Sequence, residues 1–415
     1  MELKKYKLGD VADIVNGATP STHNSENYDG SIIWITPKDL SGQKQKIIRR
    51  GQRNISEIGF NNCSAQMIPP YNILMSSRAP IGLLAINENE CCTNQGFKNL
   101  VLDKSICDTD YMYYYLQFHM KEIEALGSGT TFKEISKSAL QGIEIRLPDL
   151  EKQRDIAKCL SDLDRKIELN KQINDNLEAM AKQLYDYWFV QFDFPNEEGK
   201  PYKSSGGAMV WNEKLKREIP QGLDTPKIGD IEKNIITGKT PSCADEDNFG
   251  GDIPFVTIDD IRGNLFVFEA QRTLSTKGAD SQEKKYLPIG SLSVSCIGTI
   301  GIMGFVARLA QTNQQINSIV FEHEYNKEFL YFSLKLYFEN AKAKTGNVFA
   351  NMSKEEFASI IVAYPPKQIL QAFHNKVAPI FDSIKNNIEE INSLTKQRDE
   401  LLPLLMNGQA TVNSD

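Results

Sequence analysis

Polar loop residues recur at matched places in the two halves of this 415-residue chain, and their types suit contact with nucleic acid. Arginine, lysine, asparagine and glutamine can read base edges through paired hydrogen bonds, whereas threonine, serine and backbone N–H groups hold phosphates. Each residue alone also fits ordinary turn chemistry, so the set carries the prediction. The candidates for DNA contact are Thr19, Lys38, Arg78, Asn94, Gln95, Thr130, Thr131, Lys133, Lys239, Thr240, Asn313, Gln314 and Asn347.

Two short motifs imitate catalytic ones, but each lacks a necessary part. Residues 68–71 (Ile-Pro-Pro-Tyr) imitate a motif of adenine methyltransferases, yet Ile68 has no side-chain carbonyl to hold the amine of a flipped base. Asp193 with Glu198 and Lys200 imitates a metal-dependent nuclease triad, but these residues crowd into what reads as a flexible linker. There is no Walker A motif, and the four histidines share no ligand spacing. We expect no catalytic centre, cofactor or metal in this chain.

The candidate loops lie on an internal repeat, which is the main feature of the sequence. Residues 8–11 (LGDV) recur as 228–231 (IGDI), and residues 17–21 (GATPS) recur as 238–242 (GKTPS). The Thr-Asn-Gln triplet beginning at Thr93 recurs at Thr312. The offset drifts only from 221 at Gly17 and Gly238 to 219 at these triplets, so the copies are collinear. Shared anchors with divergent residues between them suggest one scaffold that presents two different surfaces.

Each copy is predicted to be rich in strands and turns. Short apolar runs at 32–35 and 255–258 are bounded by Gly, Pro and Asp, as strands usually are. Aromatic-rich helices are expected over 110–117 and 328–335, packed on the sheets. A final strand is expected over 143–147 in the first copy and, in the second, over 360–364.

After each copy the apolar spacing changes to alternating steps of three and four, which is typical of a coiled-coil seam. This seam runs for about four heptads in both places, longer than an ordinary surface helix, although two separate amphipathic helices are the alternative. The seam positions are Leu160, Leu163, Ile167, Asn170, Asn174, Leu177, Ala181 and Leu184, then Val377, Ile380, Ile384, Asn387, Ile391, Leu394, Arg398 and Leu401. We also expect Asn170 and Asn387 to meet if the helices pair antiparallel, because a buried Asn pair fixes register.

The predicted fold class is α+β: two tandem repeated α/β domains separated by two long helices, which form an antiparallel coiled coil with pseudo-twofold symmetry. A stretch rich in Pro, Gly and Ser marks a linker between the copies. The expected boundaries are a first repeated domain over 1–149, a central helix over 150–190, the linker over 191–217, a second repeated domain over 218–366 and a C-terminal helix over 367–407.

Composition limits the class of protein. No apolar run approaches the ~18 residues that span a bilayer, and the start of the chain has no signal peptide. Seven cysteines without C-x-x-C spacing argue against disulfides and zinc and fit a reducing cytoplasm. The net charge of −7 opposes DNA binding only on average, because affinity depends on local Lys and Arg. An acidic DNA reader is expected to gain positive surface from partner subunits.

These residues resemble the specificity subunits of type I restriction–modification systems over essentially the whole chain. The resemblance rests on the duplicated openings and GxTPS turns, the Ser-Arg-Ala-Pro-Ile-Gly stretch at 77–82 and the Pro-to-Gln entry into each helix. It also rests on the stretch 188–202, from Trp-Phe-Val-Gln-Phe-Asp-Phe-Pro to Gly-Lys-Pro-Tyr. One departure is that Ile297 of the second copy replaces Arg78 of the first.

The resemblance implies a non-catalytic subunit whose two domains each read one half of a bipartite site in double-stranded DNA. The paired helices would set the spacer and dock two methylation subunits. Restriction subunits would join them, with S-adenosylmethionine, ATP and magnesium on these partners. Two readers on a stiff coiled coil could reach major grooves about one helical turn apart.

Two other classes stay open from sequence alone. A catalytic methyltransferase or nuclease would need the cofactor and metal motifs that the chain lacks. An adaptor whose modules bind proteins instead of DNA would give no DNA binding with or without partner subunits.

Overall fold

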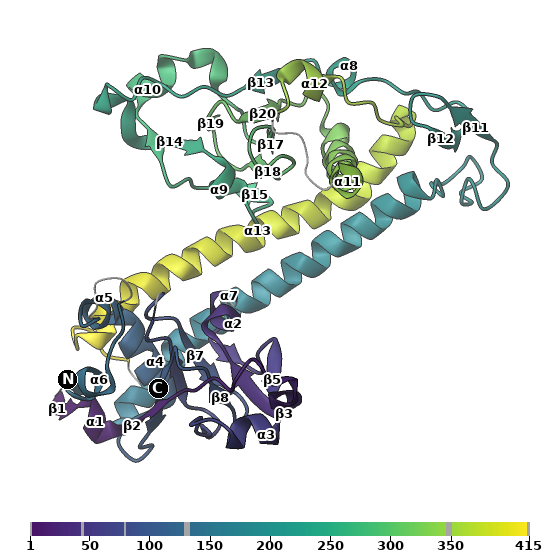
Figure 1. Cartoon of the computed structure of the whole chain (residues 1–415). Helices are drawn as coiled ribbons and strands as arrows, with labels where there is room; N and C mark the ends of the chain where they lie inside the picture. Colours follow the sequence, from purple (N-terminus) through teal and green to yellow (C-terminus); the bar gives the residue numbers. More distant parts are fainter. Residues whose placement is uncertain (1, 43–44, 79, 128–132, 346–350, 413–415) are drawn as a thin grey trace. The chain divides into compact units, whose positions relative to one another are not determined.

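The computed structural model describes residues 2–42, 45–78, 80–127, 133–345 and 351–412, and these fall into two compact units (Figure 1). The first unit is Met1–Leu169 with Asn392–Asp415, and the second is Asn170–Ile391. Thr130, Thr131 and Asn347 lie outside the described residues. No helix in the described part of the chain is both long and apolar enough to cross a membrane.

The first unit contains a five-stranded sheet in the order β2-β9-β6-β7-β4 and a three-stranded sheet in the order β5-β3-β8. A separate antiparallel pair joins β1 to β10. The strands are β1 (Lys4–Lys7), β2 (Ala12–Asn16), β3 (Tyr28–Ile35), β4 (Ile47–Ile48), β5 (Arg53–Ile55), β6 (Ile73–Met75), β7 (Leu84–Asn87), β8 (Cys92–Thr93), β9 (Lys98–Leu102) and β10 (Glu144–Leu147). The helices are α1 (Leu8–Val11), α2 (Pro37–Ser41), α3 (Glu57–Asn61), α4 (Thr109–Phe118), α5 (Met120–Ala125) and α6 (Lys137–Gln141), with the 3-10 turn η1 (Ser25–Asn27).

The second unit repeats both sheets strand for strand, in the orders β13-β20-β17-β18-β15 and β16-β14-β19. Its linker-derived hairpin, β11 with β12, has no counterpart among the described residues of the first unit. The strands are β11 (Met209–Asn212), β12 (Arg217–Pro220), β13 (Ile235–Thr237), β14 (Phe249–Val256), β15 (Phe266–Val267), β16 (Thr273–Leu274), β17 (Leu292–Ser295), β18 (Met303–Val306), β19 (Gln311–Thr312) and β20 (Ile316–Ile319). The helices are α8 (Ile228–Ile231), α9 (Ile258–Ile261), α10 (Thr276–Asp280), α11 (Lys327–Thr345) and α12 (Lys354–Ala358), with the 3-10 turns η3 (Glu246–Asn248), η4 (Glu283–Lys285) and η5 (Glu324–Asn326).

The repetition extends to irregularities of the backbone. In each unit the long strand carries a bulge at the same place, between Tyr28 and Ile32 in β3 and between Phe249 and Ile253 in β14. A bulge re-aims the chain at a fixed point and is retained as a feature of a fold. Its recurrence shows that both copies have one scaffold, which confirms the predicted α+β fold with a repeated module.

The two long helices are α7 (Leu150–Tyr185), followed by the π-helical turn η2 (Asp186–Val190), and α13 (Lys367–Met406). Each unit contains one part of α7 and one part of α13. Within each unit these two helix segments run antiparallel. In the first unit Asp164 accepts a hydrogen bond from Arg398 at 2.9 Å, and in the second Asn174 accepts one from Asn387 at 2.8 Å. All sixteen seam positions are buried or half-buried. Burial of this apolar stripe supplies most of the stabilisation of such helices.

The expected hydrogen bond between Asn170 and Asn387 is replaced by two others within the second unit. Asn170 Nδ2 donates to Glu390 Oε2 at 2.8 Å, and Asn387 Nδ2 donates to Asn174 Oδ1 at 2.8 Å. The antiparallel register therefore places Asn174, rather than Asn170, opposite Asn387. Asn170 is buried, so its amide still needs and finds a partner.

Two further expectations differ from the structure. The segment 360–364 makes only isolated bridges, Tyr364 with Asp224 and Ile361 with Lys227, because Pro226 in the facing segment has no N–H to donate. The linker is not flexible: Phe192 and Phe194 are buried in the core of the second unit. Asp193 there accepts hydrogen bonds from the backbone and hydroxyl of Ser204 at 2.7 and 2.5 Å, so its role is to fix a turn.

Candidate nucleic-acid interface

In the first unit, the GxTPS turn lies against the turn that begins with Thr93. The backbone N–H of Ala18 donates to the Thr93 carbonyl at 2.9 Å, and the Thr19 hydroxyl donates to Gln95 Oε1. A Cβ on Gly17 would come within 1.9 Å of the Asn94 carbonyl oxygen, so only glycine fits there. The structure thus brings the predicted residues Thr19, Asn94 and Gln95 together.

The second unit builds the same joint from its own residues. The N–H of Lys239 donates to the Thr312 carbonyl at 2.9 Å, and the Thr240 hydroxyl donates to Gln314 Oε1 at 2.7 Å. A Cβ on Gly238 would come within 2.2 Å of the Asn313 carbonyl oxygen. The motif is therefore a structural device that positions an exposed glutamine beside a half-buried threonine in both units.

In each unit a third segment is joined to the turn that carries the exposed glutamine through matched backbone hydrogen bonds. The N–H of Ser77 donates to the Gly96 carbonyl at 2.7 Å, and the N–H of Cys296 donates to the Gln315 carbonyl at 2.8 Å. Next to these lie the bridges of Arg78 with Glu134 and of Ile297 with Asn351. The side chains at this position differ in charge between the units, although their backbone positions are the same.

The first unit carries an ion triad at this position. Glu134 accepts from Arg78 at 2.9 Å and from Lys98 at 3.1 Å. Partial burial tends to raise the pKa of Glu134, but Lys98 and Arg78 outweigh it, and the pKa is lowered overall. Arg78 keeps about half of its side chain exposed at 47%, and Lys133 beside the triad is exposed. Arg78 is thus held in place with its outer face still open to a ligand.

Lys38 is the second residue of α2, which follows β3 after the N-cap residue Thr36, and it is exposed. Its neighbour Asp39 is a structural residue, because its carboxylate accepts from the N–H and hydroxyl of Thr36 at 2.8 and 2.7 Å. The equivalent Asp260 caps α9 from Thr257 at the same distances. Each acid completes a capping box with its N-cap threonine, an arrangement that stabilises a helix start by about 1 kcal/mol. Asp39 is therefore structural, whereas Lys38 is available for contact with a ligand.

Sequence reasoning missed a group of polar residues in the loop that leads from β4 to β5. Arg50, Gln52 and Arg53 are exposed there, and Asn54 is half-buried beside them. The sequence signal for this group is three arginines within five residues at 49–53. The repeat does not point to it, because the matching residues 268–272 of the second copy hold no such cluster.

No three His, Cys, Asp or Glu side chains gather in the described part of the chain so that they could hold a metal ion. The Ile-Pro-Pro-Tyr segment at 68–71, which imitates a methyltransferase motif, has a structural role. Ile68 is fully buried, and the amide of Asn72 caps the Pro69 and Pro70 carbonyls at 3.0 and 3.2 Å. The Pro-Pro segment is therefore a structural turn.

A duplicated scaffold that presents exposed Arg, Lys, Asn and Gln from rigidly held turns is typical of a DNA-recognition protein. A family model described as "Type I restriction modification DNA specificity domain" matches residues 1–179 and again 220–398. The chain therefore belongs to the type I restriction–modification specificity subunits, the non-catalytic DNA-recognition components of these systems, and it has two DNA recognition domains.

Individual relatives agree with this assignment. The chain is 32% identical to the type I restriction enzyme MjaIX specificity subunit of Methanocaldococcus jannaschii, over 98% of this chain and 93% of that protein. It is 31% identical to the HindI specificity subunit of Haemophilus influenzae, over 98% of this chain and 99% of that protein. The fold is also similar to the crystal structure of the S subunit from M. genitalium, with a TM-score of 0.61, 16% identity and coverage of 100% and 97%.

Proposed function

We propose that each recognition domain reads one half of a bipartite DNA site, and that α7 and α13 set the spacer between the halves. The observation that carries this proposal is the shared backbone frame with unlike exposed residues. Thr19–Gln95 and Thr240–Gln314 are the same joint, yet Arg78 is replaced by Ile297 and Lys38 by Asp259. Unlike side chains on one frame suit two different half-sites.

The long helices also suit the docking of two methylation subunits. Leu169, Ile173 and Met180 are exposed apolar residues of α7, at 53%, 38% and 58% exposure, and they lie outside the seam. Exposed apolar residues on a helix favour a protein partner. In this proposal those subunits bind S-adenosylmethionine and methylate adenine, while restriction subunits bring ATP and magnesium. This chain supplies recognition alone.

The spacer function is tested by adding one heptad to both helices at the same level. Seven residues are inserted between Asn170 and Asn174 and seven more between Asn387 and Glu390, which keeps the antiparallel seam in register. Since each helix residue adds 1.5 Å and each base-pair step 3.4 Å, the spacer should lengthen by about 3 base pairs. Methylation sites mapped across genomic DNA report the spacer directly. An unchanged spacer with unchanged half-sites would refute the ruler.

DNA binding itself is tested by gel shift on the full chain, with and without the methylation subunits. Sequence-specific, salt-sensitive binding supports the proposal. Absence of DNA binding in both states would favour an adaptor that binds only proteins, and cofactor-dependent turnover by the chain alone would favour an enzyme.

A further inference from the structure

An open depression of about 650 Å³ lies in the first unit between the start of α2 and the loop that connects β4 to β5. Its lining is polar and includes three cationic and two acidic side chains: Lys38, Arg50, Arg53, Asp29 and Asp39. A hollow of this size, open to solvent and lined by cations, accepts an extended anionic ligand rather than an apolar one.

Both acids in the depression are already used inside the protein. Asp39 accepts from Thr36 and, through its other oxygen, from the N–H of Gln52 at 2.8 Å. Asp29 pairs with Arg53 at 3.2 Å, and the Arg53 guanidinium lies 3.9 Å from the centre of the Tyr28 ring. Arg53 is thereby fixed in one plane by a carboxylate and an aromatic face.

Lys38 and Arg50 differ from Arg53 in this respect. Both are exposed, and within the described ranges neither side chain forms a hydrogen bond or ion pair with another residue. The depression therefore keeps two uncompensated cations at its rim. Two such charges attract a phosphate without the cost of first breaking an internal ion pair.

The depression is continuous with the turns of the candidate interface. The N–H of Asn94 donates to the carbonyl of Ile35 at 3.0 Å, one turn before Lys38. A Cβ on Gly96 would lie 3.2 Å from Cγ of Pro37, so these two segments touch. A DNA strand that contacts Asn94 and Gln95 would find Lys38 on the adjoining segment.

The second unit has the same backbone at this place but the opposite charge. Asp260 accepts from the N–H of Gln271 at 2.8 Å, as Asp39 does from Gln52, which aligns Lys38 with Asp259 and Arg50 with Glu269. Arg272 still lies over Phe249, 4.6 Å from its centre, as Arg53 does over Tyr28. Asp259 and Glu269 are exposed. Although Asp259 pairs with Arg262 at 3.8 Å, Glu269 places an acid where the first unit has Arg50, which disfavours phosphate.

We propose that the depression of the first recognition domain binds backbone phosphates of the DNA duplex through Lys38 and Arg50, and that the second domain makes no such contact. This inference rests on the proposed function. It makes the two domains unequal: the first anchors the chain to any DNA electrostatically, whereas the second depends more on direct contact with its own bases.

The test compares the complex of the full chain and its methylation subunits with the double variant Lys38→Ala/Arg50→Ala. The probe is a fluorescently labelled duplex of random sequence, titrated over a range of salt. Loss of two phosphate contacts should weaken binding roughly tenfold at low salt and reduce the slope of log affinity against log salt by about 2.

The matched control is Lys104→Ala/Lys121→Ala, which removes two exposed lysines of the same unit away from the depression. It should leave affinity and slope within about a factor of two, because it changes net charge equally without removing a phosphate contact. If both double variants behave alike, or if Lys38→Ala/Arg50→Ala keeps the original slope, the inference is overturned while the proposed function stands. If the unaltered complex binds no DNA, both are overturned. Unchanged thermal unfolding confirms that the variants are folded.

Discussion

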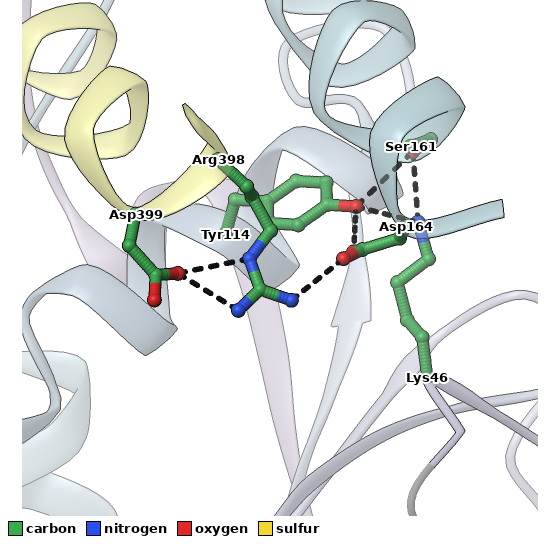
Figure 2. A network of polar contacts seen from close by, with 6 residues as sticks. All are labelled: Lys46, Tyr114, Ser161, Asp164, Arg398 and Asp399. Carbon is green, nitrogen blue, oxygen red and sulfur yellow. Dashed lines mark hydrogen bonds and ion pairs between the residues drawn. The ribbon is translucent and has the colours of Figure 1, made fainter. Parts of the chain in front are cut away.

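In the first unit Tyr114 of α4 donates a hydrogen bond to Asp164 of α7 at 2.5 Å, whereas the matched contact in the second unit packs Phe332 of α11 edge-to-face against Phe381 of α13. Figure 2 shows that the first contact belongs to a larger polar network, in which Lys46 reaches Ser161 at 2.9 Å and Arg398 reaches Asp164 at 2.9 Å. Five of the six residues drawn align by the repeat with apolar ones, pairing Lys46 with Leu265, Tyr114 with Phe332, Ser161 with Ala378, Asp164 with Phe381, and Arg398 with Ala181.

The two copies therefore share the geometry of their sheets but differ in the chemistry that attaches the sheets to the long helices. The second unit packs its helices with aromatic rings, which gain stability from buried area. The first unit uses charges that must all be satisfied at once, because a partly buried ion without its partner is costly.

A second matched pair follows the same division. Asp110 at the start of α4 is held by Lys46 at 2.6 Å, and the equivalent Glu328 at the start of α11 is held by His374 of α13 at 2.7 Å. Both acids lie in the first turn of a helix, where negative charge is favourable. The partner of the first acid is a lysine, whereas the partner of the second is a histidine, the side chain whose protonation changes most readily near neutral pH.

The largest effect is expected where the second unit's aromatic cluster is cut. Phe381 is buried, with ring centres of Phe305, Tyr331 and Phe332 at 6.0, 5.7 and 5.8 Å. Phe381→Ala should destabilise this unit by about 3–5 kcal/mol through lost burial and a cavity. Amide hydrogen exchange in α11 measures it, with Phe381→Leu as the control at about 1 kcal/mol. A cost below about 1 kcal/mol for the alanine variant would contradict the view that aromatic packing holds this junction.

The polar junction of the first unit should respond to Asp164→Ala. This change removes the acceptor of both Tyr114 and Arg398 and leaves a guanidinium only 26% exposed without its main partner. We expect a loss of about 2–3 kcal/mol, measured by exchange in α4. The control is Asp399→Ala, since Asp399 contacts the same guanidinium but is 60% exposed and should contribute less than about 0.5 kcal/mol. Equal effects of the two variants would argue against the network.

The smallest effect is a pH dependence confined to the second unit. The hydrogen bond to Glu328 raises the pKa of His374, helped by Glu324 and opposed by burial and Lys327. Its protonated form therefore stabilises the folded unit below the unfolded pKa near 6.5, and this stabilisation is lost as pH rises through the higher folded pKa.

The size of this pH effect should be about 1 kcal/mol between pH 6 and pH 8. Urea unfolding followed through exchange in α11 should show it, and His374→Gln should abolish it. Exchange in α4, where Lys46 replaces the histidine, serves as the internal control and should not follow the same curve. A dependence of equal size in both units would remove the proposed distinction.

The repeat and the seams were readable from sequence because both are periodic. Matching anchors such as Gly17 and Gly238 need only a constant offset, and the seam needs only steps of three and four. The glycine at each anchor is explained by a close approach of backbone, which any second copy of the joint must reproduce. The residues of the coiled-coil seam could therefore be predicted from the sequence alone.

The polar network could not be found in the same way. It joins Lys46 to Ser161 and Tyr114 to Asp164, and these pairs have no periodic spacing and no counterpart in the second copy. Arg398 fell on the predicted seam, but its partner did not, because Asp164 lies one position beyond the seam residue Leu163. The ordered linker was missed for another reason. Its Pro, Gly and Ser content is typical of a flexible segment, but its two phenylalanines are buried in the core of the second unit and anchor it there.

The junction shown in Figure 2 also limits how such chains can recombine. A recognition domain grafted from the second position to the first would bring leucine and phenylalanine to helices that still carry Asp164 and Arg398, leaving charges stranded in an apolar contact. Hybrids that keep their stability should therefore exchange domains between like positions, or inherit the adjoining stretch of helix together with the domain. New specificities would then evolve separately in the first and in the second recognition domain, because domains would not be exchanged between the two positions.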